Sequence, residues 1–394
     1  MTRLKIDSIA YRGSGIGRAD DGRVWFVPGV CDGEEILAEP VFEKKTFMIG
    51  RLVEALRPSP DRLTPPDCLL PFDGNTQAEE IVPGCVYAHA AYPAEIRWKQ
   101  EQLLSFLQRQ AKIENAPQIL HPPFASPKHL NYRNKITLHF APRRTLGYVA
   151  EDNETVIDIP RCPLAVPQIN ETLTEFRADP DFWRWVAKEG SLTLRWTPKD
   201  GVTVPARNQP DLTETIPGLG EITVPSSGFF QVNPEVSSAI VEHIAAIATQ
   251  RAPRRILDFY CGAGVFGLAL AKKTGAPTLG WDTGRDVIRA ANQNAAKFGL
   301  DAKFYSNDAE AGKHTANDFV IVDPPRGGLE TDIARSFAET PAGTLIYVSC
   351  APDTLARDLR IILASGKYAV KSAKLFDMFP RTAHFETCVV LERT

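Results

Sequence analysis

The first part of the chain alternates short apolar runs with turn-forming residues. Apolar runs occupy residues 6–11, 24–27, 35–41 and 48–53, and turns around Gly13, Gly15, Pro28 and Gly29 separate the first of them. Several short strands at this spacing are typical of a small closed barrel. We therefore predict an OB-like β-barrel over residues 1–56.

The pattern changes after the predicted barrel. Residues 57–83 are rich in Pro, Asp and small residues, as expected for a loop. Residues 94–111 then place Ile96, Leu103, Leu104 and Leu107 at helical spacing, with charged residues between them. Apolar runs at residues 132–140, 146–149, 192–196 and 202–204 indicate strands. These features predict a central β-rich α+β domain over residues 57–228.

The last part of the chain alternates predicted strands and helices. A helix is expected over residues 235–249, a strand with a glycine turn and a helix from residue 254, and a further helix over residues 286–298. More strands end near residues 282, 307, 323 and 350, and a final pair covers residues 373–376 and 387–391. This α/β alternation predicts a doubly wound, Rossmann-like sheet with an antiparallel edge, forming a domain over residues 229–394.

Polar residues stand where these buried strands end. Asp323 follows one apolar run and Cys350 follows another. Strand ends carry the chemistry in open α/β sheets, because the sheet fixes their positions while leaving their side chains accessible. Gly262, Gly264 and Gly267 form a G-x-G-x-x-G turn, a weak signal that also fits nicotinamide and flavin folds. Asp282 ends the next strand, where a carboxylate can accept both hydroxyls of a ribose.

The bulk composition limits the class of protein. The chain has 394 residues, 43% of them hydrophobic and 24% charged, which is typical of globular proteins of two or three domains. A formal charge of -3 lends no support to a generally basic nucleic-acid binder, although a local patch stays open. Candidate basic positions are Lys44, Lys45, Arg133, Lys135, Arg143 and Arg144.

Cysteine usage and the lack of long apolar runs indicate a cytoplasmic protein. The chain begins without an apolar core of signal-peptide length, and no run of about 18 apolar residues appears in it. Its seven cysteines are an odd number spread over the whole sequence, so a disulfide framework is not expected. We expect a cytoplasmic monomer without membrane contact, in which Cys261 and Cys388 fill the core.

Three motifs taken together resemble one family. Residues 323–326 read Asp-Pro-Pro-Arg, Ser349 precedes Cys350, and residues 379–386 read Phe-Pro-Arg-Thr-Ala-His-Phe-Glu. In this order, at these strand ends, they resemble the RNA uracil-5-methyltransferase family over nearly the whole chain. Residues 13–29 likewise resemble the TRAM domain, a small barrel appended to RNA-modifying enzymes. The resemblance implies a class I methyltransferase fold and S-adenosyl-L-methionine as methyl donor. It also implies transfer to carbon 5 of a uridine in RNA, with the TRAM-like start favouring ribosomal over transfer RNA.

The resemblance also implies roles for individual residues. Cys350 would be the nucleophile that adds to carbon 6 of uracil, and Glu386 the base that removes the proton from carbon 5. Five residues would bind the methyl donor or lie against it: Gln231, Tyr260, Gly262, Asp282 and Asp323. The chain departs from the family at two positions, because Asp282 replaces the usual glutamate and Val265 stands where some members have asparagine.

Three cysteines resemble parts of an iron-sulfur site. Cys68, Cys85 and Cys162 match segments that carry a [4Fe-4S] cluster in TRAM-bearing uridine methyltransferases. The family has a further cysteine three positions before the one matched by Cys85, and this chain has Val82 there. Because a cubane cluster usually takes four thiolates, the site is either lost or completed by a ligand other than cysteine.

The residue after Asp-Pro-Pro bears on two other activities. A methyltransferase for an exocyclic amine has an aromatic residue after Asp-Pro-Pro, and an RNA cytosine-5 enzyme has a second cysteine there. Arg326 occupies that position in this chain. A non-catalytic RNA-binding protein with a methyltransferase fold is a further alternative, which the presence of both Cys350 and Glu386 disfavours.

Overall fold

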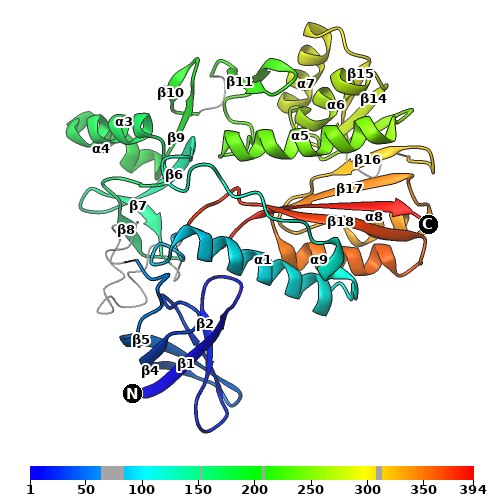
Figure 1. Ribbon diagram of the computed structural model, residues 1–394. Helices are drawn as coiled ribbons and strands as arrows, with labels where there is room; N and C mark the ends of the chain where they lie inside the picture. Colours follow the sequence, from blue (N-terminus) through cyan, green and yellow to red (C-terminus); the bar gives the residue numbers. More distant parts are fainter. Residues whose placement is uncertain (64–83, 151–152, 206–208, 308–312) are drawn as a thin grey trace. The chain divides into compact units, whose positions relative to one another are not determined.

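The computed structural model describes residues 1–63, 84–150, 153–205, 209–307 and 313–394, and in it the chain forms two compact units (Figure 1). The first unit consists of Met1–Gln102, Lys128–Arg195 and Phe379–His384. The second consists of Leu103–Pro127, Trp196–Met378 and Phe385–Thr394. Helix α1 (Tyr92–Arg109) therefore contributes its first part to one unit and its last part to the other. The division into three domains at residues 56 and 228 stays a prediction.

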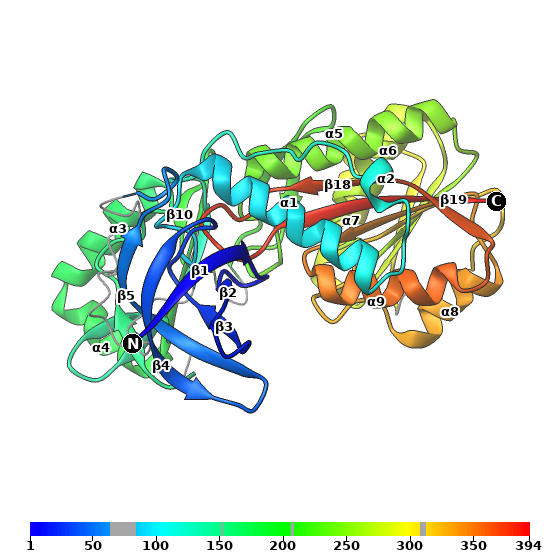
Figure 2. The same cartoon turned by 60° about the horizontal axis from the view of Figure 1, so that its bottom comes forward.

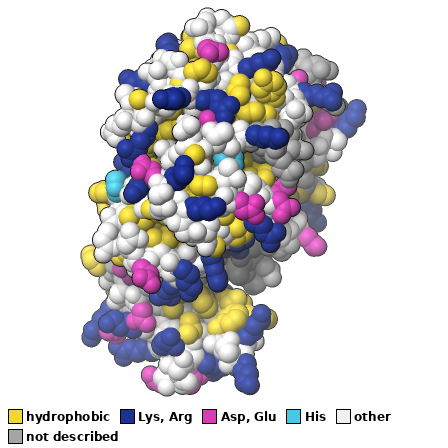
Figure 3. All heavy atoms as spheres, turned by 90° about the vertical axis from the view of Figure 1, so that its right-hand side faces the viewer, with side chains coloured by type: hydrophobic (Ala, Val, Ile, Leu, Met, Phe, Trp, Pro, Cys, Tyr) yellow, Lys and Arg dark blue, Asp and Glu magenta, His cyan; other side chains and the backbone are white. Residues whose placement is uncertain are grey.

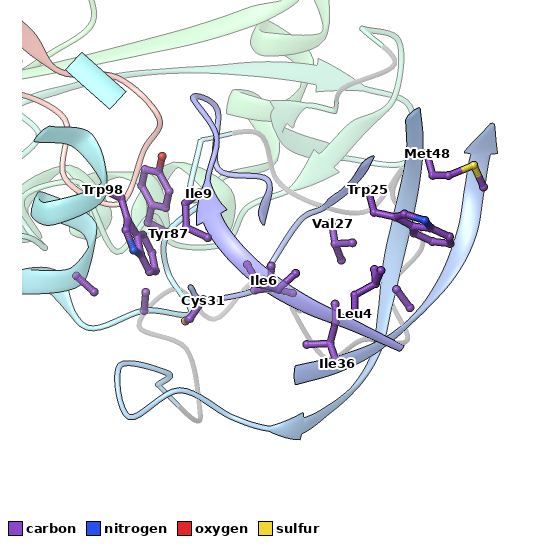
Figure 4. Close-up of a cluster of buried hydrophobic side chains, with 14 residues drawn as sticks. Leu4, Ile6, Ile9, Trp25, Val27, Cys31, Ile36, Met48, Tyr87 and Trp98 are labelled. Carbon is purple, nitrogen blue, oxygen red and sulfur yellow. The ribbon is translucent and has the colours of Figure 1, made fainter. Parts of the chain in front are cut away.

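The first unit begins with the expected β-barrel. Its strands close in the order β1-β2-β3-β5-β4, with β4 pairing back to β1; they are β1 (Thr2–Ile9), β2 (Gly15–Arg18), β3 (Val24–Val27), β4 (Glu35–Glu43) and β5 (Phe47–Arg57). Alternate side chains point inward, so that Leu4, Ile6 and Trp25 are at most 3% exposed in the core (Figure 4). Tyr87 and Trp98 extend this core from outside the barrel strands.

A five-stranded antiparallel sheet follows in the chain. Its order is β10-β9-β6-β7-β8, with β6 (Lys135–Ala141), β7 (Thr145–Val149), β8 (Val156–Asp158), β9 (Ser191–Thr197) and β10 (Gly201–Thr203). Two helices that the sequence analysis missed, α3 (Pro167–Ala178) and α4 (Pro180–Glu189), precede β9. Asp179 begins α4, because its carboxylate accepts a hydrogen bond from Asp181 N at 2.8 Å. The predicted β-rich central region thus contains a helical pair as well.

Four of the candidate basic residues lie at the two ends of strand β6. Arg143 and Arg144 are exposed in the turn between β6 and β7, where both have positive φ angles of 65° and 58°. Arg133 and Lys135 lie at the opposite end of β6 and are partly buried. A strand rises about 3.3 Å per residue, so seven residues separate the two pairs by roughly 20 Å. The four basic residues therefore do not form one continuous patch, and contact of this region with RNA stays a prediction.

A buried ion network joins helix α1 to residues near the end of the chain. Glu95 and Lys99 have fully buried side chains, and Lys99 Nζ donates to Glu95 Oε1 at 2.7 Å. Arg381 donates to the same carboxylate through its backbone N at 2.8 Å and through Nη1 at 3.3 Å. The Arg381 side chain is 1% exposed. Since buried charges are tolerated only when paired, the carboxylate of Glu95 is what permits both cations inside the unit.

Replacing Glu95 by Ala is expected to destabilise the protein by about 3 kcal/mol, because it leaves two buried cations without their anion. The measurement is the unfolding of both proteins by differential scanning calorimetry. Glu101→Ala, an exposed change on the same helix, serves as control and should alter the unfolding temperature little. Equal effects of the two substitutions would contradict the structural role of the network.

The second unit is built on a seven-stranded sheet of order β15-β14-β13-β16-β17-β19-β18. Its strands are β13 (Ile256–Phe259), β14 (Thr278–Asp282), β15 (Ala302–Ser306), β16 (Phe319–Val322), β17 (Thr344–Ser349), β18 (Tyr368–Phe376) and β19 (Glu386–Arg393). One face is covered by α5 (Pro234–Arg251), α6 (Val265–Thr274) and α7 (Arg285–Lys297), and the other by α8 (Thr331–Glu339) and α9 (Pro352–Leu363) (Figures 1 and 2). This is the predicted doubly wound architecture.

Smaller elements complete the second unit. Helix α2 (Ala116–Ile119) leads into a bridge between Leu120 and Ala373 of β18. The hairpin of β11 (Leu212–Ile216) and β12 (Gly220–Val224) is tied to α7 by Asn294, whose amide accepts from Thr223 N at 2.9 Å and donates to Thr223 O at 2.8 Å. The sequence analysis did not predict this hairpin.

Two details of the second unit differ from the sequence-based expectation. The antiparallel strand is not at the edge of the sheet: β19 is antiparallel to both neighbours and lies between β17 and β18. Phe229 and Phe230 do not end a strand, because β12 ends at Val224 and residues 225–233 lead irregularly into α5. Asn233 caps that helix by accepting from Val236 N at 3.4 Å.

Surface charges are mixed in sign. On the face shown in Figure 3, Lys and Arg side chains are spread over the surface with Asp and Glu between them. Several exposed ion pairs are local, such as Arg335 with Asp332 at 3.3 Å. Within the described residues, no helix combines the length and the apolar character needed to cross a membrane.

Candidate active site

Four neighbouring strands of the second unit end at one edge of the sheet, and each end carries a predicted site residue. Asp282 is the last residue of β14, Tyr260 follows β13, Asp323 follows β16 and Cys350 follows β17. The strand order β14-β13-β16-β17 sets them side by side in that sequence. Because adjacent strands lie about 4.8 Å apart, the edge forms a continuous row of functional groups.

Glu386 joins this row through the pairing of β17 with β19. The antiparallel register joins Val348 to Cys388 and Ser349 to Thr387, and the next residues along the two segments are Cys350 and Glu386. Opposed residues in such a pair have Cα atoms roughly 4.5–5.5 Å apart. A thiol and a carboxylate from distant parts of the sequence therefore lie next to each other, as the proposed roles require.

Burial is the main cause that raises the pKa values of the three groups at this end of the row. Burial raises the pKa of Asp323 to about 7, and burial together with Asp323 holds the pKa of Glu386 well above its usual range. Burial, followed by the charges of Glu386 and Asp323, raises the pKa of Cys350 to about 12. Glu386 is only 3% exposed, and its Oε2 has no hydrogen-bond partner among the described residues. The groups thus hold their protons more tightly than the same groups in water.

Arg326 is the cation that opposes this trend. Its charge acts on both Cys350 and Glu386 and shifts the pKa of each downward, against the larger effect of burial. Sequence reasoning used Arg326 only to exclude other enzymes and did not place it in the site. Its position three residues after the strand-end Asp323 was the available signal, because that spacing keeps it within the same turn.

The other end of the row has the features of a nucleoside site. The Asp282 carboxylate is partly buried and is oriented by Gly262 N at 3.0 Å and Gly284 N at 2.8 Å, which leaves lone pairs for ribose hydroxyls. Gly262 and Tyr260 have φ angles of 53° and 63°. Left-handed backbone at a residue other than glycine is strained and clusters at functional sites. These residues fit the nucleoside part of S-adenosylmethionine.

Two further residues near the donor side are packed in the core, and a third, Gln231, stays a predicted contact of the methyl donor. Trp281 is 7% exposed and stacks between the rings of Phe259 and Tyr305, with centroids 5.2 and 5.8 Å away, so it belongs to the core. Asp258 is fully buried and accepts from Gly267 N at 2.8 Å, and burial raises its pKa to about 7. Gln231 is partly buried in the segment before α5.

The cysteines predicted to bind a cluster lie in the first unit. Cys162 is 3% exposed and its sulfur accepts from the Tyr148 hydroxyl at 3.3 Å. Cys85 is close enough to act on the pKa of the same hydroxyl, so the two thiols share one neighbourhood. Cys68 lies outside the described residues. Among those described, no group of three or more potential ligands occurs, and the cluster stays a prediction.

The other cysteines behave as expected for core residues. Cys261 and Cys388 are 7% and 1% exposed, which confirms that they fill the core. Burial raises the pKa of Cys388 to about 12, and the pKa of Cys261 is also well above its usual value. Neither side chain is therefore a ready nucleophile at neutral pH.

The fold and the strand-end row together define a class I methyltransferase domain. A family model described as methyltransferase small domain matches residues 235–345, and one described as tRNA (uracil-5-)-methyltransferase matches residues 307–394. A solved structure of a tRNA (uracil-54, C5)-methyltransferase from Pyrococcus abyssi, in complex with S-adenosyl-L-homocysteine, has a TM-score of 0.76. It is 23% identical and covers 99% of both chains, which shows a common fold.

Curated relatives extend over the whole chain. A 23S rRNA uracil-C5 methyltransferase from Methylococcus capsulatus is 29% identical and covers 98% of this chain and 96% of its own length. An uncharacterized RNA methyltransferase from Synechocystis sp. is 27% identical and covers 100% and 96%. With the matched family model, these findings show that the chain is similar over nearly its whole length to RNA methyltransferases, among them uracil-C5 enzymes.

The raised pKa of Asp323 predicts a dependence of stability on pH. The folded protein binds this proton more tightly than the unfolded chain, so the proton stabilises the fold at low pH and its contribution is lost as pH rises from about 4 through about 7. Asp323→Asn should therefore be more stable than wild type at pH 8, by about 2 kcal/mol, with a smaller difference at pH 5.

Calorimetric unfolding of both proteins at the two pH values measures this difference. Asp332→Asn, at an exposed carboxylate on α8, is the control and should show no such pH-dependent gain. A constant offset between Asp323→Asn and wild type at pH 5 and pH 8 would contradict the assignment.

Proposed function

We propose that this protein transfers a methyl group from S-adenosylmethionine to carbon 5 of a uridine in large-subunit ribosomal RNA, through a covalent adduct with Cys350. The observation that carries the proposal is the register that sets Cys350 opposite Glu386 and near Asp323. The similarity to uracil-5-methyltransferases supports the reaction. The 23S rRNA activity in the name of a relative that matches 98% of this chain supports the choice of RNA.

The chemistry requires both groups. Carbon 5 of uracil is too weak a nucleophile to accept a methyl group unaided. The Cys350 thiolate therefore adds to carbon 6, and the electrons of the double bond move onto the ring as an enolate. Bound S-adenosylmethionine supplies the electrophilic methyl group that carbon 5 takes. Glu386 then removes the proton from carbon 5, the double bond re-forms, and the bond from carbon 6 to Cys350 breaks.

The electrostatics of the site suit this order of events. A thiol with a pKa near 12 is protonated in the free protein at neutral pH, and Arg326 is the neighbouring side chain whose charge favours the thiolate. A carboxylate with a raised pKa is a stronger base than one in water, as the later removal of the proton requires. Asp323, between the two ends of the row, would contact the uracil and the donor.

The barrel is the region that we propose to contact RNA outside the active site. Five large hydrophobic side chains are exposed on β4 and β5, namely Val41, Phe42, Ile49, Val53 and Leu56. Lys44 lies over the rings of Phe42 and Phe47, 5.6 and 5.3 Å from their centroids. Aromatic rings with a neighbouring cation bind unpaired bases by stacking, whatever their sequence. Extrusion of the target uridine costs roughly a few kcal/mol, which such contacts offset.

Substitution of the two reacting groups tests the mechanism. With a ribosomal RNA transcript and tritiated methyl donor, Cys350→Ala is expected to lower methylation by at least about a thousandfold, because no adduct forms. Glu386→Gln should accumulate a methylated RNA–protein adduct on denaturing gels, since the proton on carbon 5 cannot leave. Cys388→Ala, a core cysteine, controls for loss of a thiol. Undiminished methylation by Cys350→Ala would refute the covalent mechanism.

The barrel surface is tested by the double substitution Phe42→Ala and Lys44→Ala. We expect RNA to bind roughly tenfold more weakly and S-adenosylhomocysteine to bind unchanged, because a stacked base contributes about 1–3 kcal/mol. Point changes are preferable to deletion of residues 1–56, since Tyr87 and Trp98 pack into the barrel core. Trp185→Ala, at an exposed aromatic on α4, is the matched control. Equal loss of both ligands in titrations would contradict this division of roles.

A further inference from the structure

Helix α9 holds the loop that follows Asp323. Three backbone carbonyls of this loop accept hydrogen bonds from side chains of the helix. Thr354 Oγ1 donates to Arg326 O at 3.1 Å, and Arg357 Nη2 donates to Gly327 O at 2.9 Å and to Leu329 O at 3.1 Å. The loop conformation is therefore set by side chains of α9, which begins two residues after Cys350.

Asp358 is the buried centre of these contacts. Its side chain is 1% exposed, and its Oδ2 accepts from Leu329 N and from the Tyr347 hydroxyl, both at 2.7 Å. Its Oδ1 accepts from Arg357 Nε at 2.8 Å. The carboxylate thus ties together the loop, strand β17 and the guanidinium that binds the loop carbonyls. We call Thr354, Arg357 and Asp358 the α9 clamp.

Gly328 shows how closely the loop and the clamp fit. Its φ angle is 77°, a conformation that other residues adopt only with strain. A Cβ atom there would lie 2.5 Å from Asp358 Oδ2 and 2.6 Å from Arg357 Nη2. The backbone at this point approaches the clamp as closely as a glycine allows.

The clamp joins the two turns that carry the reacting groups. One turn carries Asp323 and Arg326, and the other runs from Cys350 into α9. Because Thr354 binds the Arg326 carbonyl, the backbone of the residue whose charge acts on Cys350 and Glu386 is fixed relative to the nucleophile itself. The charged or titratable neighbours that act on Cys350 are Glu386, Asp323 and Arg326, and Arg326 alone of these favours the thiolate.

We infer that Thr354, Arg357 and Asp358 are positioning residues, which hold Arg326 beside Cys350 and Glu386 and thereby support formation of the attacking thiolate. The inference rests on the proposed function. It adds a second set of residues, outside the row of strand ends, on which the rate of adduct formation depends. Their pattern in the sequence is Thr-x-x-Arg-Asp, which sets all three on one side of the first two turns of α9.

The test follows adduct formation with a ribosomal RNA transcript made with 5-fluorouridine. With S-adenosylmethionine present, carbon 5 carries fluorine in place of the proton that Glu386 would remove, so the cysteine cannot be eliminated. The covalent complex is therefore trapped, and the rate of its formation can be measured from pH 6 to pH 10. Arg357→Gln and Thr354→Val should slow this rate by roughly tenfold at pH 7 and move its rise to higher pH, so that the loss narrows at pH 10. Affinity for S-adenosylhomocysteine should not change.

Three comparisons separate positioning from a general structural role. Thr354→Ser keeps the hydroxyl donor and should retain the wild-type profile, and Arg360→Gln, at an exposed position of the same helix, should also retain it. In an Arg326→Ala background, Arg357→Gln should lower the rate of adduct formation little further, because Arg357 acts through the guanidinium of Arg326. The Thr354 pair answers the question even where Arg357→Gln does not fold.

Each contrary result has a distinct meaning. Absence of a trapped adduct with wild-type protein would overturn the proposed function and the catalytic role of the clamp with it. A wild-type adduct together with unchanged rates in Arg357→Gln and Thr354→Val would overturn the clamp alone. A decrease in the rate of adduct formation that is equal at every pH would likewise overturn the role of the clamp. So would a decrease that adds fully to the one caused by Arg326→Ala.

Discussion

The pairing of β17 with β19 is the constraint on which the site depends. One antiparallel register pairs the two strands as far as Ser349 and Thr387, which sets the adjacent residues Cys350 and Glu386 at the same end of the pair. The neighbouring parallel strands extend the same edge to Asp323, Tyr260 and Asp282. A slip of one residue would turn Glu386 to the other face of the sheet, because side chains alternate along a strand. The central position of β19, with a partner on each side, protects that register better than an edge position would.

This arrangement favours the reaction and lowers the stability of the folded protein. Asp258, Asp323 and Glu386 are carboxyl groups in surroundings that favour their neutral forms, and Cys350 is held as a thiol by the same burial. Active sites commonly keep such groups at a cost in stability, since their perturbed pKa values serve the chemistry. The charge of Arg326 acts in the opposite direction on Cys350 and Glu386, and the residues that hold its loop become part of the site.

The sequence predicted the barrel, helix α1, the doubly wound sheet and the row of strand ends, because each depends on local periodicity or on a strand boundary. It did not show that β6 separates Arg133 and Lys135 from Arg143 and Arg144, since proximity in sequence says nothing about the two ends of a strand. The sequence also did not predict that β19 lies between β17 and β18, because strand order depends on long-range pairing. The sequence showed only the Thr-x-x-Arg-Asp spacing of the α9 clamp. It could not show the backbone carbonyls that the clamp binds, because they lie about 30 positions earlier in the chain.

The ion network of Glu95, Lys99 and Arg381 has a consequence for synthesis of the chain. Two of its members are made early, whereas Arg381 is 286 residues away from Glu95 and near the end. The first unit therefore cannot reach its final interior before Arg381 has been synthesised, even though its barrel strands emerge first. Domains that fold as units during translation usually do so in order from the N-terminus. Here the earliest unit is completed by a segment that is made after strands β13 to β18, so that its maturation reports that these strands of the catalytic sheet have been synthesised.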